Sequence, residues 1–181
     1  GQFAREFLQL YPTANILVAT SKDFSRSKRR RFISRICTGD WDAVIIGHSS
    51  FEFIPVSRDT KENFLAEQIL EYKKIIQEFG SKKSQTVKAV EKAMENLNCK
   101  LKSLLNSPKD NVITFEKLGV DQLFVDEAHN FKNLGLITKM TRVAGVPTVS
   151  SQKAEDLYLK IRYLLKKNDY KHGVVFATGT P

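Results

Sequence analysis

Two adjacent carboxylates are the residues whose types and spacing best suit chemistry. Asp126 and Glu127 directly follow the apolar run Leu123–Val125. His129 comes three positions after Asp126 and two after Glu127. If that run is a strand of an open parallel sheet, both acids emerge at its carboxyl end, where ligands bind in such sheets. In phosphoryl-transfer sites an aspartate placed there holds Mg²⁺, and a neighbouring acid orients or deprotonates the attacking water. We therefore expect Asp126 to be a magnesium ligand and Glu127 the acid that acts on water.

A second apolar run ends in a turn rich in hydroxyl groups. Residues Val174–Ala177 are followed by Thr178, Gly179, Thr180 and Pro181. Taken alone, this is an ordinary strand-to-loop turn. Beside the Asp-Glu pair, its hydroxyls could hydrogen-bond to the nearby histidine, which predicts that the two segments lie together.

Basic residues are clustered. Seven lie within fourteen positions: Lys22, Arg26, Lys28, Arg29, Arg30, Arg31 and Arg35. A solvated helix face would explain them equally well, but such a cluster could also neutralise nucleic-acid phosphates and release their counterions. We take Arg29, Arg30 and Arg31 as the candidate contacts.

Four apolar runs are expected to form the strands that position these side chains. They are Asn15–Thr20, Asp42–His48, Gln122–Asp126 and Gly173–Thr178. Their near-continuous Val, Ile, Leu and Phe is typical of parallel strands covered on both faces. Helices are expected between them, over Gln2–Leu10, Ser27–Cys37 and Ala154–Lys166. This alternation predicts an α/β fold with a parallel sheet flanked by helices, and the aperiodic stretch Asn130–Gln152 predicts a long loop.

Residues 58–108 have a different pattern, typical of a helical hairpin. Apolar residues recur at the coiled-coil period in two series, Leu65, Ile69, Tyr72, Ile76, Phe79 and then Val87, Val90, Met94, Leu97, Leu101, Leu104. A short polar connector, Gly80–Gln85, separates them and suits an antiparallel turn. We expect a hairpin inserted between two sheet strands, acting as a lever or docking arm or only as a spacer.

Composition indicates one globular domain. The 181 residues are 41% hydrophobic and 27% charged, and the net charge of +9 favours a polyanionic partner. No apolar run is long enough for a membrane span, and no signal peptide opens the sequence. The two cysteines, Cys37 and Cys99, are too few for a disulfide framework or a Cys-built metal site. We expect buried or inert thiols and a cytoplasmic protein without a membrane partner.

These motifs together resemble superfamily-two helicases and translocases. Asp126-Glu127-Ala128-His129 is similar to their motif II, the DEAH box, and Ala177-Thr178-Gly179-Thr180-Pro181 is similar to their motif III. The SWI/SNF-type branch resembles the chain more closely, since it reads DEAH-x-x-KN where this chain has Phe131-Lys132-Asn133, and it ends motif III in TGTP. Segments Gln2–Phe7 and Trp41–Phe51 also resemble parts of that branch, and the hairpin falls where the branch has a protrusion. Within it, the chain looks most like the helicase portion of helicase–methylase proteins of bacterial mobile elements.

The resemblance implies a fold, cofactors and partners. The fold would be a partial RecA-like P-loop NTPase lobe, over residues 1–181. ATP and Mg²⁺ would be the cofactors of a longer parent protein, and double-stranded DNA, bound through its phosphates, would be the partner together with the second motor lobe of the same parent chain. His129, Thr178, Gly179 and Thr180 would couple hydrolysis to movement, and His48, Ser49 and Ser50 would contact the DNA backbone, since hydroxyls and backbone amides suit phosphate.

One essential motif of that family is missing. No G-x-x-x-x-G-K-[ST] phosphate loop occurs in the 181 residues. We therefore expect a fragment of a motor that neither holds ATP nor hydrolyses it alone, whereas the parent does. One alternative is a basic, non-catalytic α/β module that binds DNA or protein and whose motor motifs are vestigial. A nuclease is a third possibility, but it would need further acids, and Asp23, Asp40 and Asp42 show no metal-ligand spacing.

Overall fold

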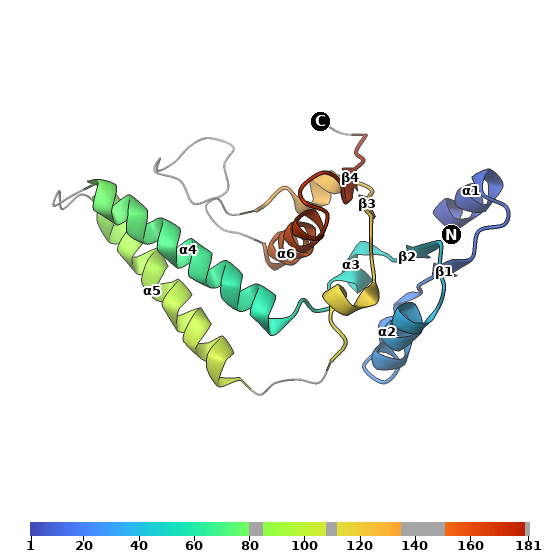
Figure 1. Ribbon diagram of the computed structural model, residues 1–181, viewed down its shortest axis with the longest axis horizontal. Helices are drawn as coiled ribbons and strands as arrows, with labels where there is room; N and C mark the ends of the chain where they lie inside the picture. The colour runs from blue at the N-terminus through green and yellow to red at the C-terminus, as the bar shows by residue number, and fades with distance from the viewer. Residues whose placement is uncertain (80–84, 108–111, 135–150, 180–181) are drawn as a thin grey trace. The chain divides into compact units, whose positions relative to one another are not determined.

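The protein has a mixed α/β fold, seen in a computed structural model that describes residues 1–79, 85–107, 112–134 and 151–179 (Figure 1). Its contacts divide the chain into two compact units. Unit 1 consists of Gly1–Pro55 and Asn111–Val120, and unit 2 of Val56–Asp110 and Asp121–Pro181. The predicted mixture of helices with parallel strands is thus confirmed.

Unit 1 contains a parallel strand pair and short helices. Its elements are α1 (Gln2–Leu10), β1 (Ile16–Val18), η1 (Ser21–Phe24), α2 (Arg29–Thr38), β2 (Ala43–Ile45), α3 (His48–Phe51) and η2 (Phe115–Leu118). Strands β1 and β2 are parallel, with Leu17 opposite Val44. Each helix called η is a single 3₁₀ turn.

The core of unit 1 gathers apolar residues from both of its chain segments. Helix α2 buries Phe32, Ile33 and Ile36, the i, i+1, i+4 positions of one helical face. Phe115 from η2 is 1% exposed, and its amide N–H donates to the Pro55 carbonyl oxygen at 2.8 Å. The later segment therefore returns to complete the core of unit 1.

Unit 2 contains the other strand pair and the long helices. Its elements are α4 (Arg58–Phe79), α5 (Gln85–Asn106), β3 (Leu123–Val125), η3 (Ala128–Phe131), α6 (Gln152–Lys167) and β4 (Val174–Phe176). Strands β3 and β4 are parallel, with Phe124 opposite Val175. None of the described helices is long and apolar enough to cross a membrane.

Helices α4 and α5 form an antiparallel pair, which we call the arm. They lie side by side in Figure 1. The Arg58 guanidinium, at the start of α4, donates to the Leu105 and Ser107 carbonyl oxygens at 2.6 and 3.0 Å, at the end of α5. The two helices of the predicted hairpin are therefore present with nearly the predicted bounds. Of its expected connector, Gly80–Gln85, the last residue begins α5, and residues 80–84 lie outside the described residues.

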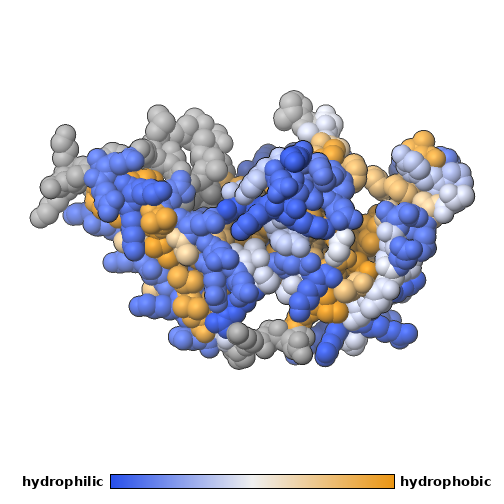
Figure 2. All heavy atoms as spheres, viewed as in Figure 1, coloured by the Kyte–Doolittle hydropathy of each residue, from blue (hydrophilic) through white to orange (hydrophobic). Residues whose placement is uncertain are grey.

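The apolar stripes of the arm are only partly as predicted. Leu65, Ile69 and Val90 are buried, but Ile75 is buried in place of the expected Ile76. Phe64, outside the predicted stripe, is also buried. Helix α4 has this wider buried face because it packs against α6 as well as α5. Figure 2 shows hydrophobic residues along the arm, bordered by hydrophilic ones.

The strands differ from the prediction in length and cover. Each has three residues, and the described strands pair as two separate two-stranded sheets rather than one sheet. Phe124 and Val175 share one face of β3–β4 and are 68% and 43% exposed. The expectation that every strand is covered on both faces is therefore wrong for the described structure of this pair. An apolar run reports strand propensity, whereas cover requires a further layer.

The segment that follows β3 also differs from a plain loop. Ala128–Phe131 forms the turn η3, and α6 begins at Gln152, capped by Ser151, whose hydroxyl oxygen accepts from the Ala154 N–H at 3.2 Å. The rest of the expected loop, residues 135–150, lies outside the described residues.

Candidate functional site

The carboxyl ends of β3 and β4 bring the two sequence motifs of unit 2 together. The Ala177 N–H donates to the Val125 carbonyl oxygen, and the Ala128 N–H donates to the Ala177 carbonyl oxygen, both at 2.9 Å. These bonds continue the parallel ladder one step beyond the strands. As a result, the turn that carries Asp126 and Glu127 lies beside the backbone that carries Thr178.

His129 contacts both segments at this edge. Its Nδ1 lies 3.2 Å from Oγ1 of Thr178 and 3.2 Å from Oε2 of Glu127. Both contacts are made by the same ring nitrogen, so Nδ1 holds the Glu127 carboxylate and the Thr178 hydroxyl together. The contact with Thr178 agrees with the expected hydrogen bond, whereas the contact with Glu127 was not anticipated. The two residues are only two positions apart, and the left-handed turn at Glu127 that brings their side chains together has no signal of its own in the sequence.

Glu127 has a left-handed backbone, with φ 49° and ψ 48°. A residue with a Cβ rarely adopts this conformation, and strained residues of this kind cluster at functional sites. Here it reverses the chain directly after the strand, so that the Asn130 N–H can donate to the Glu127 carbonyl oxygen at 3.0 Å. The two side chains of the acid pair consequently leave the strand end in a fixed turn.

Asp126 suits a site for a hydrated divalent cation. Its side chain is exposed, and its Oδ1 accepts the Glu127 N–H at 2.9 Å, which fixes its orientation. Mg²⁺ usually takes one or two protein carboxylates and fills its remaining positions with water and phosphate, so a single oriented aspartate fits this ion. No cluster of three or more His, Cys, Asp or Glu suited to a metal ion occurs among the described residues.

The remaining residues of the hydroxyl-rich turn are only partly described. Thr178 and Gly179 are exposed. Thr180 and Pro181 lie outside the described residues, and the predicted role of Thr180 stays a prediction.

The basic cluster occupies the start of α2 in unit 1. Arg30 and Arg31 are exposed, whereas Arg29 is half-buried with its guanidinium 5.4 Å from the centre of the Phe53 ring. Cations are unfavourable at a helix N-terminus, where the helix dipole is positive. The arginines of the first turn therefore do not stabilise α2, and the exposed Arg30 and Arg31 are available to an anionic partner.

The expected phosphate-binding loop after β2 is helical. His48, Ser49 and Ser50 lie in α3, a single short helix rather than the end of a strand and a loop. Ser49 is exposed and His48 half-buried, but Ser50 is only 9% exposed. The strand stops at Ile45 because Gly47 begins the helix. A phosphate contact by the Ser50 hydroxyl has no support in this conformation.

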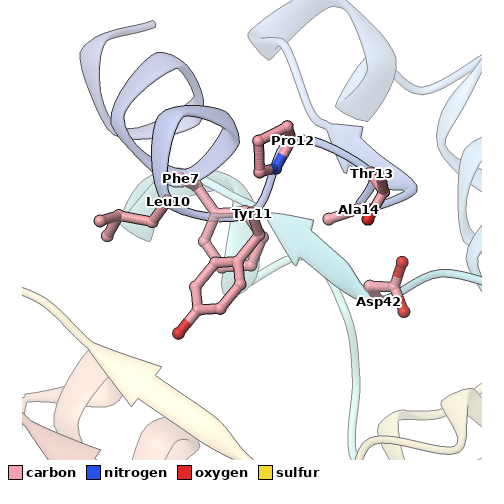
Figure 3. A pocket seen from close by; sticks show the side chains of 7 residues that line it. All are labelled: Phe7, Leu10, Tyr11, Pro12, Thr13, Ala14 and Asp42. Carbon is pink, nitrogen blue, oxygen red and sulfur yellow. The ribbon is translucent and has the colours of Figure 1, made fainter.

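A cleft of about 440 Å³ in unit 1 contains none of the predicted site residues (Figure 3). The rings of Phe7 and Tyr11, 5.1 Å apart, lie on one side of it below α1. Its one carboxylate belongs to Asp42, whose Oδ2 accepts the Asn15 N–H at 2.7 Å. Asp42 thus ties the beginnings of β1 and β2 together, which is a structural role.

Both cysteines are exposed free thiols. The expectation was buried or inert thiols; burial is wrong for both Cys37 and Cys99, whereas their lack of reactivity stays a prediction. The Cys37 Sγ donates to the Lys117 carbonyl oxygen at 3.1 Å.

Comparisons with known proteins identify a related family. A family model described as a probable helicase domain matches residues 1–181. A stretch of 69 residues is 38% identical to the "Defense against restriction protein B" of Escherichia phage P1 and covers 37% of this chain but 3% of that protein. The match therefore spans a small fraction of the length of the curated relative. No solved structure matches the chain.

Proposed function

This chain belongs to the probable helicase domain family, and we propose that it is part of the first RecA-like lobe of an ATP-dependent DNA helicase or translocase of the SWI/SNF type. Within that lobe, the arm would be the protrusion of this branch. The longer protein, with a phosphate loop and a second lobe, would hydrolyse ATP.

One observation carries this proposal. Residues 126–129 after β3, which we call the DEAH turn, lie beside the Thr178 segment after β4. Nδ1 of His129 lies 3.2 Å both from Oε2 of Glu127 and from Oγ1 of Thr178. A motor needs such a link, because an acid that acts on the nucleotide must be connected to a segment that can move with the partner. The resemblance of both segments to motor motifs supports the same assignment.

Each side chain at this edge has a proposed role. Asp126 would hold Mg²⁺, which offsets phosphate charge when bound with ATP. Glu127 would accept a proton from the water whose oxygen attacks the γ-phosphorus, while the bond to the bridging oxygen breaks and ADP leaves. His129 would keep the Glu127 carboxylate in place and transmit its position to Thr178.

Duplex DNA is the proposed partner of unit 1. Arg30 and Arg31 are the exposed contacts that we propose, with Ser49 and His48 as further candidates and Arg29 partly engaged by Phe53. Contacts to phosphates carry no base information, so binding should be sensitive to salt and indifferent to sequence.

ATP turnover tests the proposal. A longer polypeptide that joins this chain to its phosphate loop and second lobe should hydrolyse ATP, with stimulation by duplex DNA and loss on chelation of Mg²⁺. Asp126→Asn should raise the Mg²⁺ concentration required. The purified 181-residue chain should show no turnover, since phosphoryl transfer depends on the phosphate loop as well. DNA-stimulated hydrolysis by the purified chain, or an unchanged Mg²⁺ requirement in Asp126→Asn, contradicts these assignments.

The exposed arginines at the start of α2 favour a second candidate function. A basic module without catalysis would bind DNA or protein through α2 and retain the acid pair without using it. In that case the longer protein would bind duplex DNA but show no turnover that depends on Glu127.

A further inference from the structure

Helix α6 contacts both the arm and the DEAH turn, and this places one arginine in a special position. The Arg162 Nη2 donates to Oε2 of Glu67, on α4, at 2.5 Å. Its guanidinium also lies 5.7 Å from the centre of the Phe64 ring and 5.8 Å from that of Tyr158. The two rings pack edge to face at 5.7 Å. Arg162 is thus held by an ion pair and two aromatic rings at once, a geometry that a planar guanidinium favours.

The contact between α6 and the arm is made away from the start of α6. A cleft of about 460 Å³ lies between the first turns of α6 and the arm. It is lined by Gln152, Glu155 and Asp156 from α6 and by Lys61 and Lys100 from the arm. Phe64 also lines this cleft, and beyond it Tyr158 and Arg162 contact α4 directly.

Both ends of α6 are fixed to the segments around the DEAH turn. At its start, Lys153 Nζ lies 4.5 Å from the centre of the Phe131 ring of η3, and the Ser151 N–H donates to the Asn133 carbonyl oxygen at 2.8 Å. At its end, Lys167 Nζ lies 2.8 Å from Oδ1 of Asp121, just before β3. Helix α6 is consequently attached before and after the strand that carries Asp126 and Glu127.

We propose that α6 fixes the direction of the arm relative to the DEAH turn, and that Arg162 is the positioning residue for this contact. A load on the arm would then be transmitted to α6, and through it to η3 and β3. This inference goes beyond the proposed function, since the attachment of the arm does not depend on whether ATP is hydrolysed.

The distance between the arm and η3 tests this inference directly. In the 181-residue chain with Cys37→Ser and Asn130→Cys, spin labels on Cys99 of α5 and on residue 130 report that distance by pulsed electron paramagnetic resonance. Cys99 and Asn130 are both exposed. We expect a single narrow distance distribution, which Arg162→Ala broadens and Arg162→Lys restores only in part, because it keeps the charge beside Glu67 but not the planar guanidinium against the two rings.

Lys166→Ala is the matched control, because it removes an exposed cation one turn further along the same helix. It should leave the distribution narrow. A narrow distribution in Arg162→Ala, or equal broadening by Lys166→Ala, overturns the proposal. Thermal melts verify that each variant folds, and if Arg162→Ala does not melt cooperatively, Arg162→Gln decides by the same criterion. If the longer protein shows no ATP turnover while Arg162→Ala broadens the distance distribution as expected, this inference stands and only the proposed function is contradicted.

Discussion

The two parallel strand pairs of this protein share one local architecture and carry different chemistry. Each pair has two strands of three residues in matched register. In unit 1, β2 leads into the short helix α3, whose His-Ser-Ser residues include one buried hydroxyl. In unit 2, β3 leads into two exposed acids and a left-handed turn. Parallel pairing only brings two strand ends to one edge, so the residue types that follow decide what the edge can do.

The largest expected effect concerns the acid pair in unit 2. In the longer protein, Glu127→Gln should lower kcat for ATP by about 10²–10⁴-fold, the usual contribution of a general base, because the amide cannot take the proton from water. The KM for ATP should change little. Steady-state kinetics measure both, and Glu52→Gln, at an exposed acid of unit 1, is the control. Full ATP turnover in Glu127→Gln would contradict the role of Glu127 as the base, and with it the proposed chemical difference between the two strand pairs.

The next effect should destabilise unit 2 without affecting unit 1. Lys160 is 0% exposed, and its Nζ lies 2.5 Å from Oδ2 of Asp156. Lys160→Met keeps the length of the side chain but removes the ammonium group that pairs with this carboxylate. Since that carboxylate is partly exposed, we expect a loss of about 2–3 kcal/mol, below the value for a fully buried pair. Hydrogen exchange should accelerate in α6 and β3 but not in α2.

A double variant serves as the control for that result. Lys160→Met combined with Asp156→Leu removes both charges and should recover most of the lost stability. If the single variant were as stable as the wild type, the buried pair would have no structural role.

A smaller effect concerns DNA binding by unit 1. The double variant Arg30→Ala, Arg31→Ala should weaken binding to duplex DNA by about 10-fold near ~0.1 M salt. The slope of log K against log salt concentration should fall by the amount that corresponds to about two phosphate contacts. Fluorescence anisotropy across a salt series measures both quantities. Lys166→Ala with Lys171→Ala removes the same charge from unit 2 and should have less effect. Equal losses in both double variants would show that net charge alone, rather than α2, attracts DNA.

The smallest effect is the response of unit 1 to acid. Hydrogen bonds from the side chain and the backbone N–H of Thr20, helped by the charges of Lys28 and Arg35, lower the pKa of Asp23 from its ordinary value. A lowered pKa in the folded state means that the ionised carboxylate stabilises the fold above about pH 4, and that this contribution disappears as the pH falls through the folded-state pKa. The difference in Tm between wild type and Asp23→Asn should therefore shrink between pH 6 and pH 3. A difference independent of pH would mean that Asp23 acts through its shape alone.

The sequence predicted element types well, because these depend on local periodicity. The period of α4 and α5 and the apolar runs of all four strands were sufficient to place them. Cover of the strands was not predictable: Phe124 and Val125 are equally apolar, yet one is 68% and the other 5% exposed. That difference depends on which face another layer reaches. The same limit explains Ile75, which is buried in place of its neighbour because α4 packs against two helices.

At the candidate site, the sequence predicted which two segments lie side by side, but it did not predict the backbone conformation of the turn. The proximity of the His129 and Thr178 segments follows from parallel pairing of two recognisable strands. The left-handed Glu127 and its contact with His129 depend on the turn after the strand, and position 127 itself is neither a glycine nor an asparagine, the residues that would signal that conformation. The segment that contains Ser50 was expected to be a loop but forms the helix α3. A four-residue helix has too little periodicity to be recognised in a sequence.

The left-handed conformation of Glu127 has opposite consequences for folding stability and for the proposed catalytic role of this residue. A left-handed residue with a Cβ costs about 1–2 kcal/mol relative to one without, so Glu127→Gly should yield a hardier polypeptide that has lost its proposed base. A selection of variants for thermal stability alone would favour Glu127→Gly. The strained glutamate therefore marks where improving robustness would sacrifice catalysis.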